Sequence, residues 1–122
     1  MAEQLHPVIS VRLFGDRKCF GPGVAALLRR VDEHHSLRAA AQSMEMAYSK
    51  AWTITKNAEN ELGFRLLVSS AGGRNGGGAA LTENARRLLD AYDRYCDELR
   101  DYAARRFDEA FSFCIAARED GA

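Results

Sequence analysis

Apolar residues recur at spacings of three and four along most of the chain, which is the period of amphipathic helices. The first stripe predicts a helix from Pro22, which suits an opening turn, to about His34. Its apolar positions are Val24, Leu27, Leu28 and Val31. Ser36 is a good N-cap for a second, short helix that runs to about Met44. Two helices are therefore expected in the first third of the chain.

A third helix is predicted from about Ala47 to Leu62, after a tight connector at residues 45–46. One face of this helix is apolar and is expected to be buried; it consists of Ala51, Ile54, Ala58 and Leu62. Thr55 lies on the inner side as well, where its methyl group can pack and its hydroxyl can bond back to a helical carbonyl. Gly63 provides the C-terminal stop.

Strands are predicted at two places. Val8–Phe14 alternates apolar and polar residues and ends at a Gly-Asp turn, so it is interpreted as a short strand whose partner lies elsewhere in the chain. Arg65–Ser70 and Ala79–Leu81 are expected to pair as an antiparallel hairpin. The tip between them, Ala71 to Gly78, contains five glycines.

Thr82 is expected to cap the last helix. Residues along this helix follow alternating spacings of three and four, which is the pattern of a coiled-coil interface: Ala85, Leu88, Tyr92, Tyr95, Leu99 and Tyr102. A second apolar stripe beside it consists of Leu89, Cys96, Ala103, Phe107 and Ala110. A small domain has little with which to cover both stripes, so a homodimer is expected. Beyond Phe111 the sequence leaves the structure open.

These elements together predict a mainly α fold with a small β-hairpin wing. Residues 1–81 are interpreted as a winged helix-turn-helix DNA-binding domain. Residues 82–122 are interpreted as a dimerisation helix and tail that belong to the same structural unit. In this arrangement the helix from Ala47 to Leu62 enters the major groove of double-stranded DNA with its N-terminal side chains against base edges.

The polar face of that helix supplies the candidate DNA contacts. Lys50, Thr53 and Asn57 are expected to read bases, and the backbone is expected to be held by Arg38, Tyr48, Ser49 and Lys56. At the wing tip, Arg74 is expected to reach the minor groove, and Asn75 beside it is a further candidate DNA contact. Trp52 is interpreted as a packing residue, directed toward the wing or the first helix, and not as a DNA contact.

Composition and charge fit this interpretation. The 122 residues are 47% hydrophobic and 28% charged, as expected of one globular domain. The net charge of zero hides a division, because residues 1–78 hold 10 Lys+Arg against 7 Asp+Glu, while residues 79–122 hold 7 against 10. No long apolar run or secretory segment is present, so a cytoplasmic protein is expected. The three cysteines are too widely spaced for a disulfide framework or a CxxC pair.

Other functions find less support in the residues. The glycine-rich segment lacks the Gly-Lys-Ser/Thr ending of a phosphate-binding P-loop. Asp32, Glu33, His34 and His35 point in different directions on a helix, so a metal site is not expected. Neither a Ser/His/Asp set nor a carboxylate pair is recognisable as a catalytic site. The sequence therefore predicts neither an enzyme nor a cofactor.

Five segments form a set: Ser36-Leu37-Arg38-Ala39-Ala40-Ala41, Tyr48-Ser49-Lys50-Ala51-Trp52, Glu61-Leu62-Gly63, Gly72-Gly73-Arg74-Asn75-Gly76-Gly77-Gly78-Ala79 and Leu81-Thr82. Together they resemble the N-terminal DNA-binding domain of ModE-type molybdate-responsive transcription regulators, over about residues 20–105. The skeleton is similar, more loosely, to the head of LysR-type regulators. The resemblance implies a dimeric regulator that binds an inverted-repeat operator.

One difference from ModE-type regulators limits what the resemblance implies. They carry oxyanion-binding domains after the dimer helix, whereas this sequence stops at Ala122, so binding of molybdate or another oxyanion is not expected of this chain. Two alternatives stay open. The first is a protein-interaction module with weak or lost DNA binding, controlled by a partner chain. The second is an effector pocket at the dimer helices that uses Tyr92, Tyr95 and Tyr102.

Overall fold

The computed structural model describes residues 3–70 and 78–121. By internal packing the chain divides into two compact units. The central unit is Ser10–Ala91, and the terminal unit combines the segment up to Ile9 with the segment from Tyr92 onward. Helix α4 (Glu83–Ala110) begins in the central unit and ends in the terminal unit.

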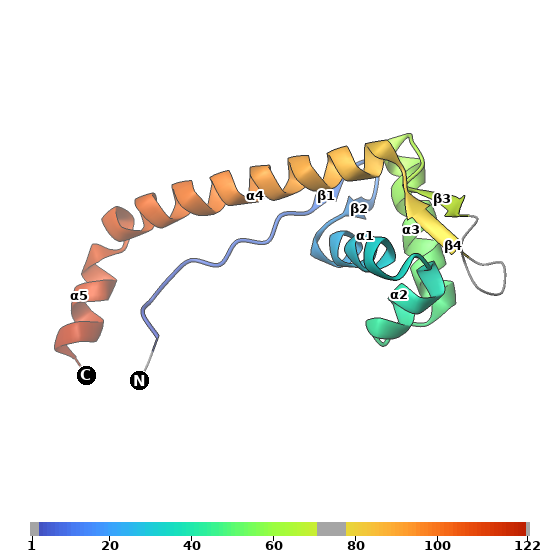
Figure 1. Cartoon of the computed structure of the whole chain (residues 1–122). Coiled ribbons are helices and arrows are strands. Elements are labelled where there is room, and N and C mark those ends of the chain that lie inside the picture. The colour runs from blue at the N-terminus through green and yellow to red at the C-terminus, as the bar shows by residue number, and fades with distance from the viewer. Residues whose placement is uncertain (1–2, 71–77, 122) are drawn as a thin grey trace. The chain divides into compact units, whose positions relative to one another are not determined.

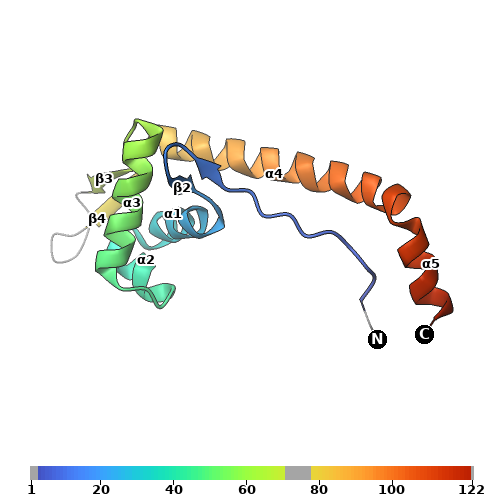
Figure 2. The ribbon, with the colours of Figure 1, turned by 180° about the vertical axis from the view of Figure 1, so that it is seen from behind.

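Three helices of the central unit confirm the predicted helices. They are α1 (Pro22–His34), α2 (Leu37–Ser43) and α3 (Tyr48–Leu62). Both α1 and α3 pack against α2, as Figures 1 and 2 show from opposite sides. The Ser36 hydroxyl accepts the N–H of Ala39 at 3.1 Å, which is the expected N-cap bond. Gly63 ends α3 in the left-handed conformation, with φ 83°.

The inner face of α3 differs in part from the predicted one. Ala51 and Ala58 are buried as expected, but Ile54 and Leu62 are only half-buried. Thr55 takes the central position instead, and its hydroxyl donates to the carbonyl of Ala51 at 2.8 Å. This bond satisfies a buried polar group within the helix, so the position does not need an aliphatic residue.

The predicted strand Val8–Phe14 is wrong in its extent and in its partner. Only β1 (Leu13–Phe14) is a strand, and it pairs with β2 (Lys18–Phe20), which follows it directly. Hydrogen-bonded pairing requires a neighbouring strand, and the tight turn brings β2 opposite only the last residues of the alternating segment. At the turn, the Arg17 N–H donates to the Glu61 carboxylate at 2.8 Å, which ties this hairpin to the end of α3.

The predicted wing hairpin is confirmed with slightly different ends. Strands β3 (Leu67–Ser70) and β4 (Gly78–Leu81) are antiparallel. Thr82 then links the hairpin to α4, because its hydroxyl donates to the carbonyl of Arg65 at 2.7 Å and accepts the N–H of Ala85 at 3.0 Å. The expected cap of the last helix is therefore present.

The core of the central unit lies between the helices and the two hairpins. The largest fully buried side chains are Phe20, Leu27, Leu28, Val31 and Leu66. At the surface, Arg86 of α4 forms a two-point bond with Asp32 of α1, the shorter distance being 2.8 Å. The hydrogen bond from Arg86 lowers the pKa of Asp32 below its ordinary value. The observed partner of Asp32 is this guanidinium.

The terminal unit contains the rest of α4 and a further helix, α5 (Ser112–Asp120), in the region that the sequence left open. The rings of Phe107 and Phe111 stack with centroids 5.0 Å apart at the break between the two helices. Arg118 of α5 donates to the backbone carbonyl of Glu3 at 2.8 Å. Among the described residues, no helix has both the length and the apolar character that crossing a membrane requires.

Candidate nucleic-acid interface

The outward face of α3 carries polar side chains on its N-terminal half. With Ala51, Thr55 and Ala58 buried, the helical period of 3.6 residues directs Ser49 and Thr53 straight outward. Lys50 and Asn57 lie on one flank of this row, and both are exposed. The structure thus places the three predicted base readers on one accessible side of α3, next to Ser49.

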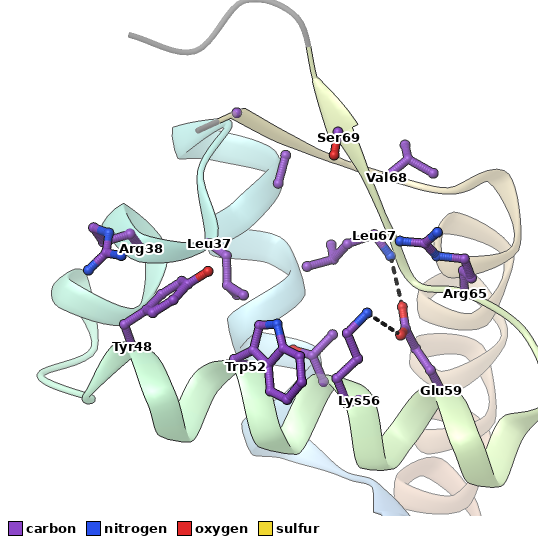
Figure 3. A pocket seen from close by; sticks show the side chains of 13 residues that line it. Leu37, Arg38, Tyr48, Trp52, Lys56, Glu59, Arg65, Leu67, Val68 and Ser69 are labelled. Carbon is purple, nitrogen blue, oxygen red and sulfur yellow. Dashed lines mark hydrogen bonds and ion pairs between the residues drawn. The ribbon is translucent and has the colours of Figure 1, made fainter. Parts of the chain in front are cut away.

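On the other flank of α3 a hollow of about 380 Å³ separates the helix from the wing hairpin (Figure 3). We call it the wing-side hollow; its polar and aromatic lining residues include Arg38, Tyr48, Trp52, Lys56, Glu59 and Arg65. The guanidinium of Arg38 lies 4.1 Å from the centre of the Tyr48 ring. The structure therefore brings together two predicted backbone contacts from α2 and α3, in a cation–π arrangement that orients both side chains.

Trp52 differs in part from its predicted role. It lines the wing-side hollow together with Leu67 and Val68 of β3, as a residue directed toward the wing should. However, 49% of its surface is exposed, so it does not act as a buried anchor. Trp52 and Arg65 are exposed residues of this surface that are not among the predicted DNA contacts. Since Trp52 stands four residues after Tyr48 and four before Lys56, the helical period was the signal that placed it beside them.

Glu59 joins α3 to the wing hairpin. Its side chain is only 9% exposed, and its carboxylate accepts the N–H groups of Leu66 at 2.7 Å and Leu67 at 3.4 Å. It also forms an ion pair with Lys56 at 3.2 Å. Burial by itself raises the pKa of Glu59, but the bonds from Leu66, Lys56 and Leu67 outweigh it, so the pKa lies below the ordinary 4.5. Lys56, a predicted backbone contact, is therefore already engaged within the chain.

Replacing Glu59 by Gln is expected to lower the free energy of unfolding at pH 7 by about 1–3 kcal/mol, because a charged acceptor of two buried N–H groups is lost. A carboxyl whose pKa is depressed by folding stabilises the fold fully above its unfolded pKa, and this contribution disappears as the pH falls through the folded pKa. In urea titrations, the difference in free energy of unfolding between the wild type and Glu59→Gln should therefore become smaller below pH 4.5.

The exposed Glu33 of α1 provides the control for this prediction. The variant Glu33→Gln removes the same charge and is expected to leave stability within about 0.5 kcal/mol of the wild type. A gap for Glu59→Gln that stays equally wide at pH 3 and pH 7 would contradict the assigned role of its carboxylate.

The remaining predicted contacts are placed as follows. Arg74 and Asn75 of the wing tip lie outside the described residues. Along α4, the chain itself buries Ala85 and Tyr92 of the predicted dimer row, together with Leu89 and Cys96 of the neighbouring stripe. The other members of the predicted row stay accessible: Leu88 and Leu99 are half-buried, and Tyr95 and Tyr102 are 54% and 57% exposed. No group of three or more metal-binding side chains occurs in residues 3–70 and 78–121.

Comparison with known proteins agrees with this geometry. Residues 25–86 match the bacterial regulatory helix-turn-helix protein family named lysR. The transcriptional regulator ModE of Haemophilus influenzae is 40% identical over 73 residues, which cover 59% of this chain and 28% of that protein. ModE of Yersinia pestis is 37% identical over 83 residues, covering 67% of this chain and 29% of the relative. The DNA-binding transcriptional dual regulator ModE of Escherichia coli is 35% identical with the same coverage.

These similarities confirm the predicted resemblance to ModE-type regulators in the helix-turn-helix region. The matched segment spans less than a third of each relative's length. The family description and the names of the relatives support a DNA-binding transcription regulator rather than an enzyme. The match covers α2, α3 and the wing, which are the elements that form the candidate interface. The chain therefore belongs to the lysR family of bacterial regulatory helix-turn-helix proteins.

Proposed function

We propose that this protein binds double-stranded DNA sequence-specifically, as a homodimer on an inverted-repeat operator. In each protomer, α3 enters the major groove with Lys50, Thr53 and Asn57 at the base edges. Arg38, Tyr48, Ser49 and Lys56 contact the backbone, and Arg74 and Asn75 of the wing reach the minor groove. The observation that carries the proposal is the exposed polar row on α3, with cations on both flanks.

The dimer is supported by the accessible part of the predicted row on α4. Leu88, Tyr95, Leu99 and Tyr102 follow one another at intervals of seven, four and three residues, which keeps them on one face of α4 beside the stripe that the chain already buries. In a two-fold dimer formed through this row, the two copies of α3 are related by the same axis. Each copy binds one half-site, so an inverted repeat is expected.

Selection from random duplex DNA tests this function. The purified chain is used to capture duplexes at two salt concentrations, and bound sequences are counted. An inverted repeat that is enriched, and whose binding weakens steeply with salt, supports the proposal, because each phosphate contact releases counterions. No enrichment at low salt would contradict it and would favour the protein-interaction alternative.

Replacing Lys50 by Ala tests the base contacts on the selected duplex. We expect a loss of about 1–3 kcal/mol in binding free energy and a relaxed preference at one base pair. Arg87→Ala is the control, since Arg87 is an exposed cation on α4 that is not among the predicted DNA contacts. An equal loss on all duplexes, with the sequence preference unchanged, would move Lys50 from the base readers to the backbone contacts.

A further inference from the structure

A second hollow, of about 440 Å³, lies on the flank of α3 opposite the wing. Its walls come from β2, from the start of α1 and from α3, all within the central unit. We call it the β2-side hollow. On α3 it is lined by Lys50, Ile54 and Asn57, so it adjoins the proposed base readers directly.

The side chains around the β2-side hollow carry unbalanced positive charge. Arg12, Lys18 and Lys50 all line it, and no carboxylate is among its lining residues. Within residues 3–70 and 78–121, none of these three cations forms a hydrogen bond or an ion pair. By contrast, the wing-side hollow contains Glu59, which already pairs with Lys56. Three unpaired cations around one concave surface attract an anion.

The start of α1 adds hydrogen-bond donors to the same surface. Gly23 and Val24 of the first turn line the hollow, and the N-cap residue Gly21 makes no side-chain cap bond. The first backbone bond into the helix is made by Ala25 to the carbonyl of Gly21 at 3.0 Å. No acidic residue stands in the first turn. The N–H groups of Gly23 and Val24 therefore have no acceptor among the described residues, and the positive end of the helix dipole is not compensated.

We infer that the β2-side hollow is a phosphate-binding site. Arg12, Lys18 and the backbone amides at the start of α1 contact the phosphate. This inference rests on the proposed function, because the phosphate it favours belongs to the DNA backbone beside the bases that Lys50 and Asn57 read. The arrangement positions α3 from both sides. Backbone contacts of this kind set the register of the helix in the groove and carry no sequence information.

Arg12 and Lys18 lie outside every contact predicted from the sequence. Both precede α1, Arg12 directly before β1 and Lys18 within β2, whereas helix-turn-helix contacts were expected from α2, α3 and the wing. Lys18 is in β2, and β2 packs against α3. The N-terminal hairpin therefore contributes to the DNA surface on this interpretation, and its position relative to α3 is part of the recognition geometry.

The test measures affinity and salt dependence for the full chain on the selected duplex. Arg12→Ala and Lys18→Ala are each expected to weaken binding about tenfold on every duplex. Each should also reduce the salt slope of log affinity by about 0.9, because one phosphate contact is lost. Arg17→Ala is the matched control: Arg17 is exposed in the same hairpin, but it does not line the hollow.

A gain of negative charge provides a second variant that does not disturb the fold. A side chain at Gly23 meets no atom within 4 Å, and an acidic residue suits the first turn of a helix. Gly23→Glu is therefore expected to keep or raise stability in urea and to weaken DNA binding more than tenfold. Arg12→Ala, Lys18→Ala and Gly23→Glu could all show the same DNA affinity and the same salt slope as Arg17→Ala. That result would show that the hollow does not bind a DNA phosphate.

A titration with inorganic phosphate, followed by NMR, separates the two sources of phosphate. Shifts of the Gly23 and Val24 amides in the wild type, absent from an Arg12→Ala and Lys18→Ala double variant, support the site itself. If these amide shifts occur but the variants do not change DNA affinity, the ligand is a free phosphate ion. If there are no amide shifts and no change in DNA affinity, the inference is overturned. If the wild type selects no duplex, the proposed function has failed, and this titration alone decides whether the hollow binds phosphate.

Discussion

The double variant Tyr95→Glu and Tyr102→Glu is expected to be monomeric and to bind an inverted repeat about 100-fold or more weakly, because the second half-site no longer adds avidity. Both tyrosines are more than half exposed in the single chain, so the fold itself should tolerate the change. In a two-fold dimer the four new carboxylates face each other along α4, where desolvation and like charge oppose association. Affinity for a single half-site should stay near that of the wild type.

The control for this variant makes the same change in net charge at positions of α4 outside the predicted dimer row. Arg94→Gln combined with Ala104→Glu lowers the charge by two, and both positions are exposed. Sedimentation velocity gives the oligomeric state, and titrations with full and half operators give the two affinities. A double tyrosine variant that stays dimeric, or a wild type that is monomeric at micromolar concentration, would remove this row as the dimer interface.

Replacing Phe20 by Ala is expected to lower the free energy of unfolding by about 3–5 kcal/mol. Phe20 is fully buried in the core of the central unit, where the truncated side chain would leave a cavity that its neighbours fill only in part. A loss of this size is a large share of the 5–15 kcal/mol that typically stabilises a domain. DNA binding should be lost at temperatures where the variant unfolds.

The strand β1 supplies a matched control, because Phe14 is of the same residue type and 66% exposed. Phe14→Ala is expected to change stability by about 0.5 kcal/mol or less. Both variants are compared with the wild type by urea titration at equal protein concentration, since the proposed dimer would make stability depend on concentration. Equal losses for Phe14→Ala and Phe20→Ala would show that the N-terminal hairpin does not contribute to the core in the way the burial of Phe20 implies.

The helices could be predicted from the sequence because their signals are local. The stripe from Val24 to Val31, the cap at Ser36 and the stop at Gly63 all act within one or two helical turns. The wing hairpin could also be predicted from the sequence, because a Gly-rich segment between two short apolar runs favours a turn. These elements, in their order along the chain, indicate a winged helix-turn-helix, and the family match confirms it.

The pairing of β1 was not predictable in the same way. The alternation in Val8–Phe14 has the period of a strand, but a strand also needs a partner, and the partner depends on the turn that follows. The alternating pattern does not show where a strand begins, so the predicted strand extends beyond β1, over residues that are not strand in the structure. The burial of Phe20 and the exposure of Phe14 show which side of the pair faces the core.

The sequence by itself determined the helices, the wing and the polar face of α3, because periodicity and capping are local properties. Only the tertiary structure decided which polar side chains share a surface. Glu59 is an ordinary surface residue by sequence, and it is buried in the structure because the N–H groups of Leu66 and Leu67, at the start of β3, lie beside it. Lys50 is far in sequence from Arg12 and Lys18, and the three line one hollow because β2 packs against α3. Such groupings depend on long-range packing, which no local pattern encodes.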